Sequence, residues 1–234
     1  MNFNEDILVN PQEVAQEQKT FMVKVFGLMA LALAVTGLVA MYTASSASMI
    51  KFIFGNRGVF IGLFIVQILA VGSLAGWEHK MSVATATSIF IGYSILTGLV
   101  FSSIFLIYTT GSIATTFFIT GGMFAIMSAY GYFTGNDLSR FGSLLFMLLI
   151  GLIIASVVNI FLSSTTMYWI ITYVGVFIFT GLVAYDTQKI KDMSMAYEQG
   201  SAEHKKVAIM GALSLYLDFI NLFLMLLRLF GSRK

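Results

Sequence analysis

An apolar segment near the end of the chain, residues 211–231, reads "GALSLYLDFINLFLMLLRLFG" and carries one acid, Asp218, close to its middle. The segment is long enough to cross a bilayer, because a helix spans the hydrocarbon core with roughly 20 apolar residues. An acid deep in such a helix costs at least about 2.5 kcal/mol on insertion scales, so it is rarely retained without a partner or a pathway to serve. The segment therefore predicts a transmembrane helix with a functional carboxyl group.

The composition of the whole chain also indicates a membrane protein. Of its 234 residues, 58% are hydrophobic and 10% are charged, whereas a soluble domain is about 25% charged. A net charge of +2 without a basic patch argues against a nucleic-acid partner. The lack of cysteine excludes disulfides, thiolate metal sites and cysteine nucleophiles. The polar, acidic start of the chain differs from the basic opening of a secretory signal, so we expect the first apolar run to be retained as an anchor.

Seven apolar stretches separated by short polar breaks predict an all-α integral membrane protein with seven transmembrane helices. They form a single domain, residues 21–231, between a polar tail at 1–20 and a short C-terminal tail at 232–234. The short break "TTGS" at 109–112 predicts a tight antiparallel hairpin of the third and fourth helices, and 187–206 is the one substantial loop. The expected spans are 21–43, 59–77, 83–108, 112–133, 142–162, 167–187 and 207–229.

The distribution of basic residues predicts the orientation, because positively charged loops stay in the cytoplasm. Eight basic residues lie on the side of the N-terminus and five lie on the other side. The eight are Lys19, Lys24, Lys80, Arg140, Lys189, Lys191, Lys205 and Lys206, and the five are Lys51, Arg57, Arg228, Arg233 and Lys234. We therefore expect a protein of the bacterial cytoplasmic (inner) membrane with its N-terminus in the cytoplasm and its C-terminus outside.

A second acid, Asp186 in "GLVAYDTQKI", is expected inside the sixth span, although Lys189 one turn away offers it a simple interfacial ion pair. The midpoint between Asp186 and Asp218 is residue 202, within "QGSAEH", the expected turn of the last loop. Residues equidistant from a turn lie at similar depth on neighbouring antiparallel helices. The two carboxyl groups are therefore predicted to face each other.

Polar residues of the last helix share one face, which predicts that this helix lies at the centre of the bundle with the other six around it. This stripe consists of Gly211, Ser214, Asp218, Asn221, Met225 and Arg228. Similar faces occur in the fifth span at Ser156, Asn159 and Ser163, and in the third span at Ser94, Thr97 and Ser102. These groups either line a narrow hydrated path or cross-link helices. We assign Ser214, Asn221 and Asn159 as polar residues that support the aspartate pair.

Two carboxyl groups held close together share one proton and titrate as a unit. When that proton leaves, two anions repel each other, part their helices and expose oxygen ligands that suit a hard cation such as calcium. The sequence thus predicts a pH-sensitive calcium leak with Asp186 and Asp218 as the pH sensor and candidate calcium ligands. Apart from this permeant ion we expect no cofactor.

Enzyme functions fit the sequence less well. Tyr185-Asp186 matches the first motif of presenilin-type intramembrane aspartyl proteases, but Asp218 follows Leu215-Tyr216-Leu217 where those proteases have Gly-x-Gly. Their proline-containing third motif is impossible in a chain whose only proline is Pro11. Both histidines, His79 and His204, are expected in loops, so a serine–histidine dyad within the bilayer lacks its base. We therefore expect that the protein is not an enzyme.

The segments around both aspartates resemble the signature sequences of the Bax inhibitor (TMBIM) family. These are "GLVAYDTQKI" and "GALSLYLDFINLFLMLLRLFG", and "LTGLVFSSIF" at 96–105 resembles the third-helix motif of that family. The polar N-terminal tail and the length are most similar to its bacterial, YccA-like branch. The resemblance implies six helices around a central seventh, with Asp186 and Asp218 as a pH sensor for calcium leak across the membrane.

The resemblance also implies two further features. Some bacterial relatives carry an arginine near the end of helix two that latches onto the aspartate pair, and the corresponding region here is Glu78, His79 and Lys80. YccA-like relatives are linked to the membrane-anchored protease FtsH as substrates and modulators. Residues 1–20 are polar and poor in aromatics, which suits an extended tail that such a protease could grip.

Overall fold

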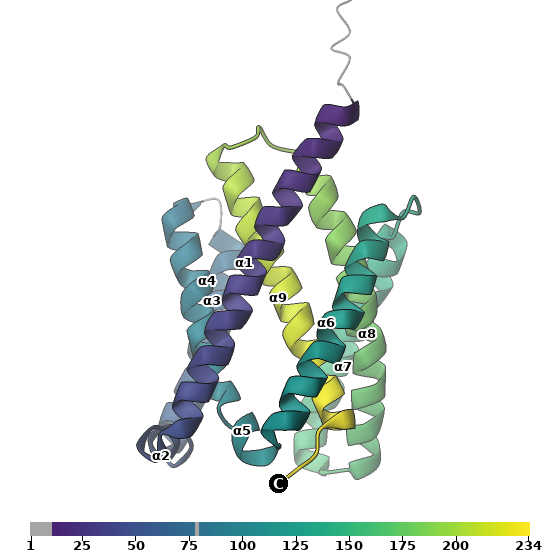
Figure 1. The fold of residues 1–234 in the computed structure, drawn as a ribbon. Coiled ribbons are helices and arrows are strands. Elements are labelled where there is room, and N and C mark those ends of the chain that lie inside the picture. Colours follow the sequence, from purple (N-terminus) through teal and green to yellow (C-terminus); the bar gives the residue numbers. More distant parts are fainter. Residues whose placement is uncertain (1–10, 78–79) are drawn as a thin grey trace, which may run out of the picture.

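The computed structural model describes residues 11–77 and 80–234, and this part of the chain folds into a helical bundle (Figure 1). Seven of its helices are long and apolar enough to cross a membrane, which confirms the predicted number of spans. The helices are α1 Pro11–Ser45, α2 Ala47–Phe54, α3 Arg57–Trp77, α4 Val83–Phe101, α5 Ile104–Ile107, α6 Thr110–Phe133, α7 Ser139–Leu162, α8 Thr165–Met193 and α9 Ala202–Phe230.

The helices extend further than the apolar stretches, because the loss of apolar residues marks the edge of the bilayer and not the end of a helix. Helix α1 begins at Pro11, so residues 11–20 of the expected polar tail are helical. Their sequence is rich in Gln, Glu, Ala and Lys, which are good helix formers, and proline is favoured in the first turn. The loop expected at 187–206 is also shorter, since α8 continues to Met193 and α9 begins at Ala202.

Hydroxyl side chains in the short breaks start several of the helices. The side-chain oxygens of Ser82, Thr109, Ser164 and Ser201 each accept a hydrogen bond from the backbone N–H three residues later. A cap of this kind satisfies one of the N–H groups that a helix start leaves without a partner. In the turn between α8 and α9, Gly200 has φ +81°, a left-handed conformation that glycine adopts without strain.

Helix α9 is the most buried helix of the bundle. It packs against α8, α1, α6 and α4, whereas α3 packs mainly on α4 and α2, and α7 packs on α8. Within the most apolar part of each span, 67% of the residues of α9 are buried, but only 6% of those of α3 and of α7. Helix α9 is therefore central, as predicted, but in the described part of the chain only α1, α4, α6 and α8 pack closely on it (Figure 1). The predicted arrangement of six helices around it is met only in part, because α3 and α7 pack on other helices.

The predicted hairpin of the third and fourth spans is wrong. Helix α4 packs on α1 and α3, whereas α6 packs on α8 and α9. Between them the chain bends at Ser102 and Ser103 and forms the short helix α5, which carries it across the end of the bundle (Figure 1). The polar break at 109–112 turns the chain, but a turn fixes neither which helix lies beside the next one nor how far apart they are.

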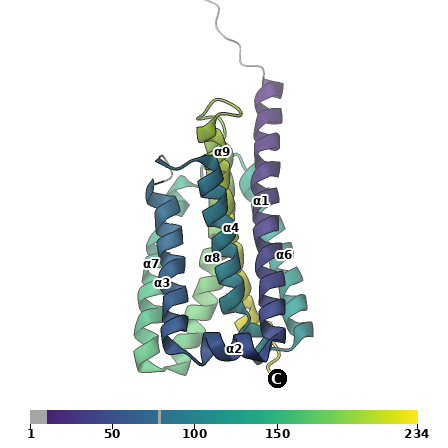
Figure 2. The ribbon, with the colours of Figure 1, turned by 90° about the vertical axis from the view of Figure 1, so that its left-hand side faces the viewer.

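Short segments close the end of the bundle that holds the C-terminus. Helix α2 lies across this end between α1 and α3, nearly perpendicular to both (Figure 2). The C-terminal tail pairs with the α5–α6 junction, because Thr109 N donates to Ser232 O at 2.9 Å and Lys234 N donates to Ile107 O at 3.0 Å. The tail predicted at 232–234 is thus held in place by backbone hydrogen bonds.

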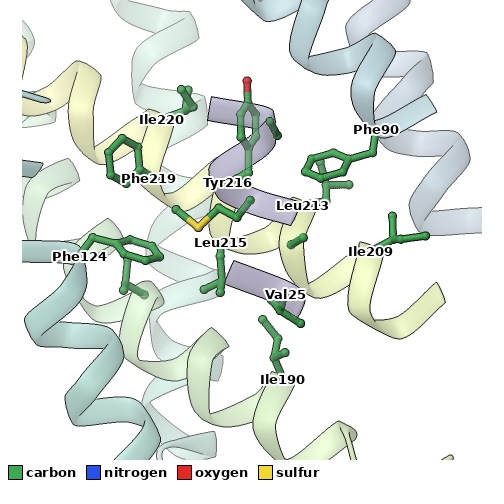
Figure 3. Packing of buried hydrophobic residues seen from close by; sticks show 14 of the residues in the cluster. Val25, Phe90, Phe124, Ile190, Ile209, Leu213, Leu215, Tyr216, Phe219 and Ile220 are labelled. Carbon is green, nitrogen blue, oxygen red and sulfur yellow. The ribbon is translucent and has the colours of Figure 1, made fainter. Parts of the chain in front are cut away.

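Large apolar and aromatic side chains form the core where α9 meets α1, α4 and α6 (Figure 3). Tyr216 is fully buried there, with the rings of Phe90 and Tyr93 edge-on at 5.8 Å and 6.0 Å between ring centroids. Phe219 packs against Phe124 of α6 at 5.6 Å. This core holds one side of α9 rigidly and leaves its other side to face α8.

Candidate functional site

Asp186 of α8 and Asp218 of α9 lie next to each other inside the bundle. The two carboxyl groups are close enough to form a hydrogen bond with each other. A hydrogen bond between two carboxyl groups forms only when one of them carries a proton and donates it. Asp218 is 6% exposed and Asp186 is partly buried. The structure thus brings together the two acids that the sequence predicted to meet.

Close packing of α8 on α9 sets the register of the pair. Gly211 of α9 lies against the side chain of Ile190, and Gly175 of α8 lies against Met225. In sequence, the midpoint of each of these two residue pairs lies near Gly200 and Ser201, close to the expected turn. The small glycines let the helix backbones approach, as is usual where no hydrophobic effect drives association in a bilayer.

The polar stripe of α9 is the face that this helix presents to α8. Gly211 contacts Ile190 at one end of the stripe. At the other end, the Arg228 guanidinium lies 5.3 Å from the centroid of the Tyr168 ring of α8. Between these contacts lie the two acids. The stripe is therefore buried between two helices, as its composition predicted, instead of facing lipid.

A cavity of about 710 Å³ surrounds the two acids. It begins at Ser139, the exposed first residue of α7, and continues between α7, α8 and α9 as far as Asn221. Its lining residues are Ser139, Gly142, Ser143, Phe146, Leu149, Ile153, Phe179, Leu182, Tyr185, Asp186, Lys189, Ser214, Leu217, Asp218 and Asn221. The cavity thus connects the acids to the end of the bundle at which α1 begins.

Some oxygen atoms around the aspartate pair have no hydrogen-bond donor in the described part of the chain. The Oδ2 atom of Asp218 is buried and has no hydrogen-bond partner among the described residues. Asn221 donates its side-chain N–H to Leu217 O at 2.8 Å, which leaves the amide oxygen as an acceptor. Ser214 lines the same cavity. A buried acceptor without a donor is costly, so this site suits a proton, water or a cation.

Lys189 does not replace Asp218 as the partner of Asp186. It lines the cavity with its Nζ 5.9 Å from the centroid of the Tyr185 ring, and it is exposed. Lys189 interacts electrostatically with Asp186, but among the described residues no ion pair within 4.0 Å is found between them. Gly142 of α7 lies directly against the same tyrosine ring, where any larger residue would overlap it.

An apolar layer separates the cavity from the opposite end of the bundle. Its buried residues come from α7, α8 and α9 and pack as one cluster. They are Leu152, Ile171, Ile178, Phe179, Leu182, Leu222, Met225 and Leu226. An ion that passed between these side chains would lose most of its hydration, which is costly in an apolar environment.

The predictions for Asn159 and His204 need correction, and for the polar face of the third span the structure favours one of the two alternatives. Asn159 lies near the far end of α7, where its Oδ1 accepts from Ser164 N at 3.0 Å, so it caps the start of α8 and does not support the acids. In the third span, Ser94 Oγ donates to Phe90 O at 3.0 Å, as buried hydroxyls commonly do within a helix. His204 lies in the first turn of α9, 6% exposed, with its ring 4.7 Å from that of Phe21, and not in a loop.

The remaining third-span hydroxyls also bond within their own helix and do not line a path. Thr97 Oγ1 donates to Tyr93 O at 2.9 Å and Ser102 Oγ donates to Leu99 O at 2.6 Å. In the fifth span, Ser156 Oγ donates to Leu152 O at 2.7 Å. Ser94 O also accepts from Thr36 of α1 at 3.0 Å, and the Ser94 and Thr97 side chains interact with Tyr216 of α9. For the third span these contacts favour the alternative that the polar residues cross-link helices.

Gln188 has a positioning role that the sequence did not reveal. Its Oε1 accepts from Leu138 N and its Nε2 donates to Asn136 O, both at 2.8 Å. These two bonds attach the α6–α7 loop to α8 beside the mouth of the cavity. The only sequence signal was an amide two residues after Asp186, at the end of a span, where a polar side chain is unremarkable.

The predicted latch region is only partly described. Glu78 and His79 lie outside the described residues. Lys80 is exposed and is not one of the residues that line the cavity. The described side chains around the pair therefore provide Lys189 as the nearby cation.

The donor set suits a weakly held hard cation better than a tightly bound metal. Two carboxyl groups, one amide oxygen and one hydroxyl are oxygen ligands of the type that calcium prefers, but calcium takes six to eight of them. Among the described residues there is no group of three or more His, Cys, Asp or Glu side chains that could hold a metal ion.

These features define a class, namely all-α integral membrane proteins with seven spans and a buried pair of acids. The family model described as "Inhibitor of apoptosis-promoting Bax1" matches residues 18–234. The chain belongs to this Bax inhibitor family, as its aspartate segments predicted.

Relatives occur in several bacteria. The chain is 49% identical to the inner membrane protein YbhL of Escherichia coli K12 over 230 residues, which covers 98% of this chain and 97% of YbhL. It is 45% identical to the uncharacterized protein RP147 of Rickettsia prowazekii, with 92% of this chain and 91% of that protein covered. It is 39% identical to YrjE of Lactococcus lactis, with 90% of each chain covered. Together with the seven apolar helices, these relatives support a multi-pass protein of the inner membrane.

Proposed function

We propose that this protein is a pH-sensitive leak for calcium or other cations, gated by the pair Asp186 and Asp218. The observation that supports the proposal most directly is the close approach of the two carboxyl groups, within hydrogen-bonding reach of each other, in one cavity. While the pair holds its proton, the hydrogen bond ties α8 to α9. The apolar layer beyond it is then closed.

Loss of the proton changes the forces between the two helices. Two carboxylates in contact repel each other, and the repulsion is strong because little water screens it. Separation of α8 from α9 relieves this repulsion. The separation admits water and cations to the acids and opens the apolar layer. The leak is therefore closed at acid pH and opens as the pH rises.

The orientation of the protein in the membrane determines the side to which the aspartate cavity opens. With the N-terminus in the cytoplasm, as the excess of basic residues on that side favours, the cavity opens to the cytoplasm. The acids then respond to cytoplasmic pH, and the apolar layer faces the outside. Cysteine variants at Ser139 and at Thr165 test this orientation, because only Ser139→Cys should be shielded from an impermeant thiol reagent in intact cells.

Calcium flux into liposomes tests the gate. We expect flux of the wild-type protein to rise from pH 5 to pH 7.5 by up to about tenfold per unit while the protonated form dominates. Asp218→Asn and Asp186→Asn should remove this pH response, because an amide cannot lose the shared proton. Asp137→Asn makes the same chemical change in an exposed loop and should leave the response intact. Flux that ignores both pH and Asp218→Asn would contradict the proposal.

A role as a modulator of the FtsH protease is a second candidate. Its support is the polar start of α1, in which Gln12, Glu13 and Gln16 are exposed at the end of the bundle assigned to the cytoplasm. Removal of residues 1–10 should lengthen the lifetime of the protein in cells with active FtsH and should have no effect in cells without it. An unchanged lifetime in both strains would argue against this role.

That the protein has no enzymatic activity also stays a prediction. The chain belongs to a family of Bax inhibitor-type membrane proteins and not to a known enzyme family. Incubation of the purified protein with model transmembrane peptides provides the test. Cleavage that is lost in Asp218→Asn would establish a protease instead.

A further inference from the structure

An apolar groove of about 950 Å³ is lined by α1 and α6. These two helices lie on one side of α9, whereas α7, which lines the aspartate cavity, lies on the other side (Figures 1 and 2). The groove extends along the last turns of α6 and the first turns of α1. From Phe124 to Phe133 the α6 wall is about 14 Å long, at a rise of 1.5 Å per residue. The rings of Phe26 and Phe124 meet across its inner end at 6.3 Å between centroids.

The groove changes from polar to apolar along its length. At its outer end α1 contributes Gln12, Gln16 and Lys19. Deeper in, the lining is apolar and includes Met22 of α1 and Ala125 of α6. A molecule that fits this gradient has a polar, charged end and an aliphatic chain, which is the chemistry of a membrane lipid.

A buried hydroxyl group in the wall lacks a partner. Ser128 is 6% exposed and lines the groove, and its Oγ has no hydrogen-bond partner in the described part of the chain. Elsewhere on the same helix, Thr120 donates to Thr116 O at 2.8 Å. The Ser128 hydroxyl can therefore donate a hydrogen bond to a group outside its own helix. A lipid ester carbonyl is an acceptor of suitable depth.

The charge at the mouth of the groove selects a negative headgroup. Lys19 is exposed at the rim. A second cation, Lys191, donates to Tyr132 O at 2.9 Å and lies 5.4 Å from the centroid of that ring, which forms part of the groove wall. Among the described residues that line the groove there is no acid. A basic residue close to anionic lipid contributes about 1 kcal/mol.

We propose that the groove between α1 and α6 binds one anionic glycerophospholipid of the leaflet at this end of the bundle. The phosphate lies at Lys19, an ester carbonyl accepts a hydrogen bond from Ser128, and an acyl chain lies along Ala125 toward Phe26. This site is independent of the aspartate pair and of ion leak.

Binding can be measured by native mass spectrometry and by thermal stabilisation of the purified full chain in detergent. The probes are phosphatidylglycerol and phosphatidylcholine with identical acyl chains, together with palmitate and inorganic phosphate given separately. We expect one phosphatidylglycerol per chain, bound about fivefold more tightly than phosphatidylcholine. Stabilisation by palmitate or phosphate alone to the same degree would overturn the assignment to a phospholipid.

Three variants separate the contacts. Ala125→Phe fills the groove and should abolish retention of both lipids, whereas Ala34→Phe adds the same ring at an exposed position of α1 and should retain them. Lys19→Gln should remove the preference for phosphatidylglycerol, whereas Lys80→Gln, with the same change of charge at the same end, should keep it. Ser128→Ala should weaken binding of both lipids about threefold.

The lipid-free stability of Ser128→Ala distinguishes a ligand contact from a structural one. Removal of an unpartnered buried hydroxyl should leave the melting temperature without lipid unchanged or higher, while the lipid-induced increase becomes smaller. If Ala125→Phe does not fold, Ala129→Phe one turn away fills the same groove. Equal retention of phosphatidylglycerol by wild type and by a folded groove-filling variant would overturn the proposal.

Discussion

Two faces of helix α9 bury polar groups in opposite ways. Toward α1 and α4, the Tyr216 hydroxyl lies 2.7 Å from Thr36 Oγ1, which is in turn 3.0 Å from Ser94 O. These hydroxyl groups therefore have partners, and the rings of Phe90 and Tyr93 pack around Tyr216. Toward α8, Asp218 lines a cavity and its Oδ2 has no partner among the described residues.

The difference separates stability from function within a single helix. A buried polar group whose hydrogen bonds are all made contributes to a unique packing. A buried acid with an unused acceptor costs free energy in the resting state, and its retention points to a state in which that acceptor is used. Both faces of α9 bury polar groups, and they differ in whether those groups have hydrogen-bond partners. The following substitutions test this distinction, from the largest expected effect to the smallest.

Tyr216→Ala should cause the greatest loss of stability. It removes a fully buried ring from the packed face and leaves a cavity, which costs about 3 to 5 kcal/mol for a large aromatic residue. Equilibrium unfolding in mixed micelles measures the change. Tyr216→Phe keeps the ring and loses only the hydroxyl contact, so about 1 kcal/mol is expected. Equal losses in the two variants would show that the ring does not fill the core.

Gly131→Ala tests the helix contact beside the cavity. A Cβ atom at Gly131 of α6 would overlap the carbonyl oxygen of Ala184 in α8, two residues before Asp186. Since the backbone must move, we expect a loss of about 1 to 3 kcal/mol and altered pH dependence of calcium flux. Gly122→Ala on the same helix meets nothing within 4 Å and should be neutral or stabilising. Equal behaviour of the two variants would contradict this close approach.

Asp218→Asn should change stability little at acid pH, by no more than about 1 kcal/mol, because an amide can still bond to Asp186. At high pH the wild-type pair loses its proton and the two anions destabilise the closed bundle. Wild-type stability should therefore fall as pH rises, and the variant should lack that fall. Thermal unfolding from pH 5 to pH 9 gives both curves. A strong destabilisation by Asp218→Asn at pH 5 would assign the acid a structural role.

Asp137, in the exposed loop before α7, should show the opposite sign and the smallest effect. Hydrogen bonds from the Ser139 hydroxyl and from its backbone N–H lower the pKa of this carboxyl group. The N–H bond measures 2.8 Å. A lowered pKa stabilises the folded loop above the unfolded pKa, and this contribution is lost as pH falls through the folded pKa. Amide exchange at Ser139 should therefore speed up, after correction for intrinsic rates, only at acid pH. Asp137→Ala should exchange at that faster rate at every pH.

Much of the architecture could be predicted because a bilayer imposes strong composition rules. Hydrophobic length alone identified seven spans, and the scarcity of acids in them directed attention to Asp186 and Asp218. The polar stripe on the last helix identified its inward face, because polar groups avoid lipid. None of these inferences needs knowledge of which helix lies beside which.

Neighbour relations and exact polar partners could not be predicted in the same way. The hairpin of the third and fourth spans failed because lipid covers every apolar helix equally, so short connections do not decide packing. Asn159 was misassigned because a helix-end cap and a cavity-lining amide have the same sequence pattern. Gln188 was overlooked because its two partners come from a loop some 50 residues away in the chain.

The sequence by itself determined the class of protein, the number of spans and the identity of the two acids, because the energetic cost of charge in lipid is local and can be summed along the chain. Only the tertiary structure decided that the acids touch, that Asp218 keeps an unpartnered oxygen and that a cavity reaches them from one end. These properties depend on side chains brought together from α7, α8 and α9. The separation of α8 and α9 is set by small residues such as Gly175 and Gly211, which let the two helices approach closely.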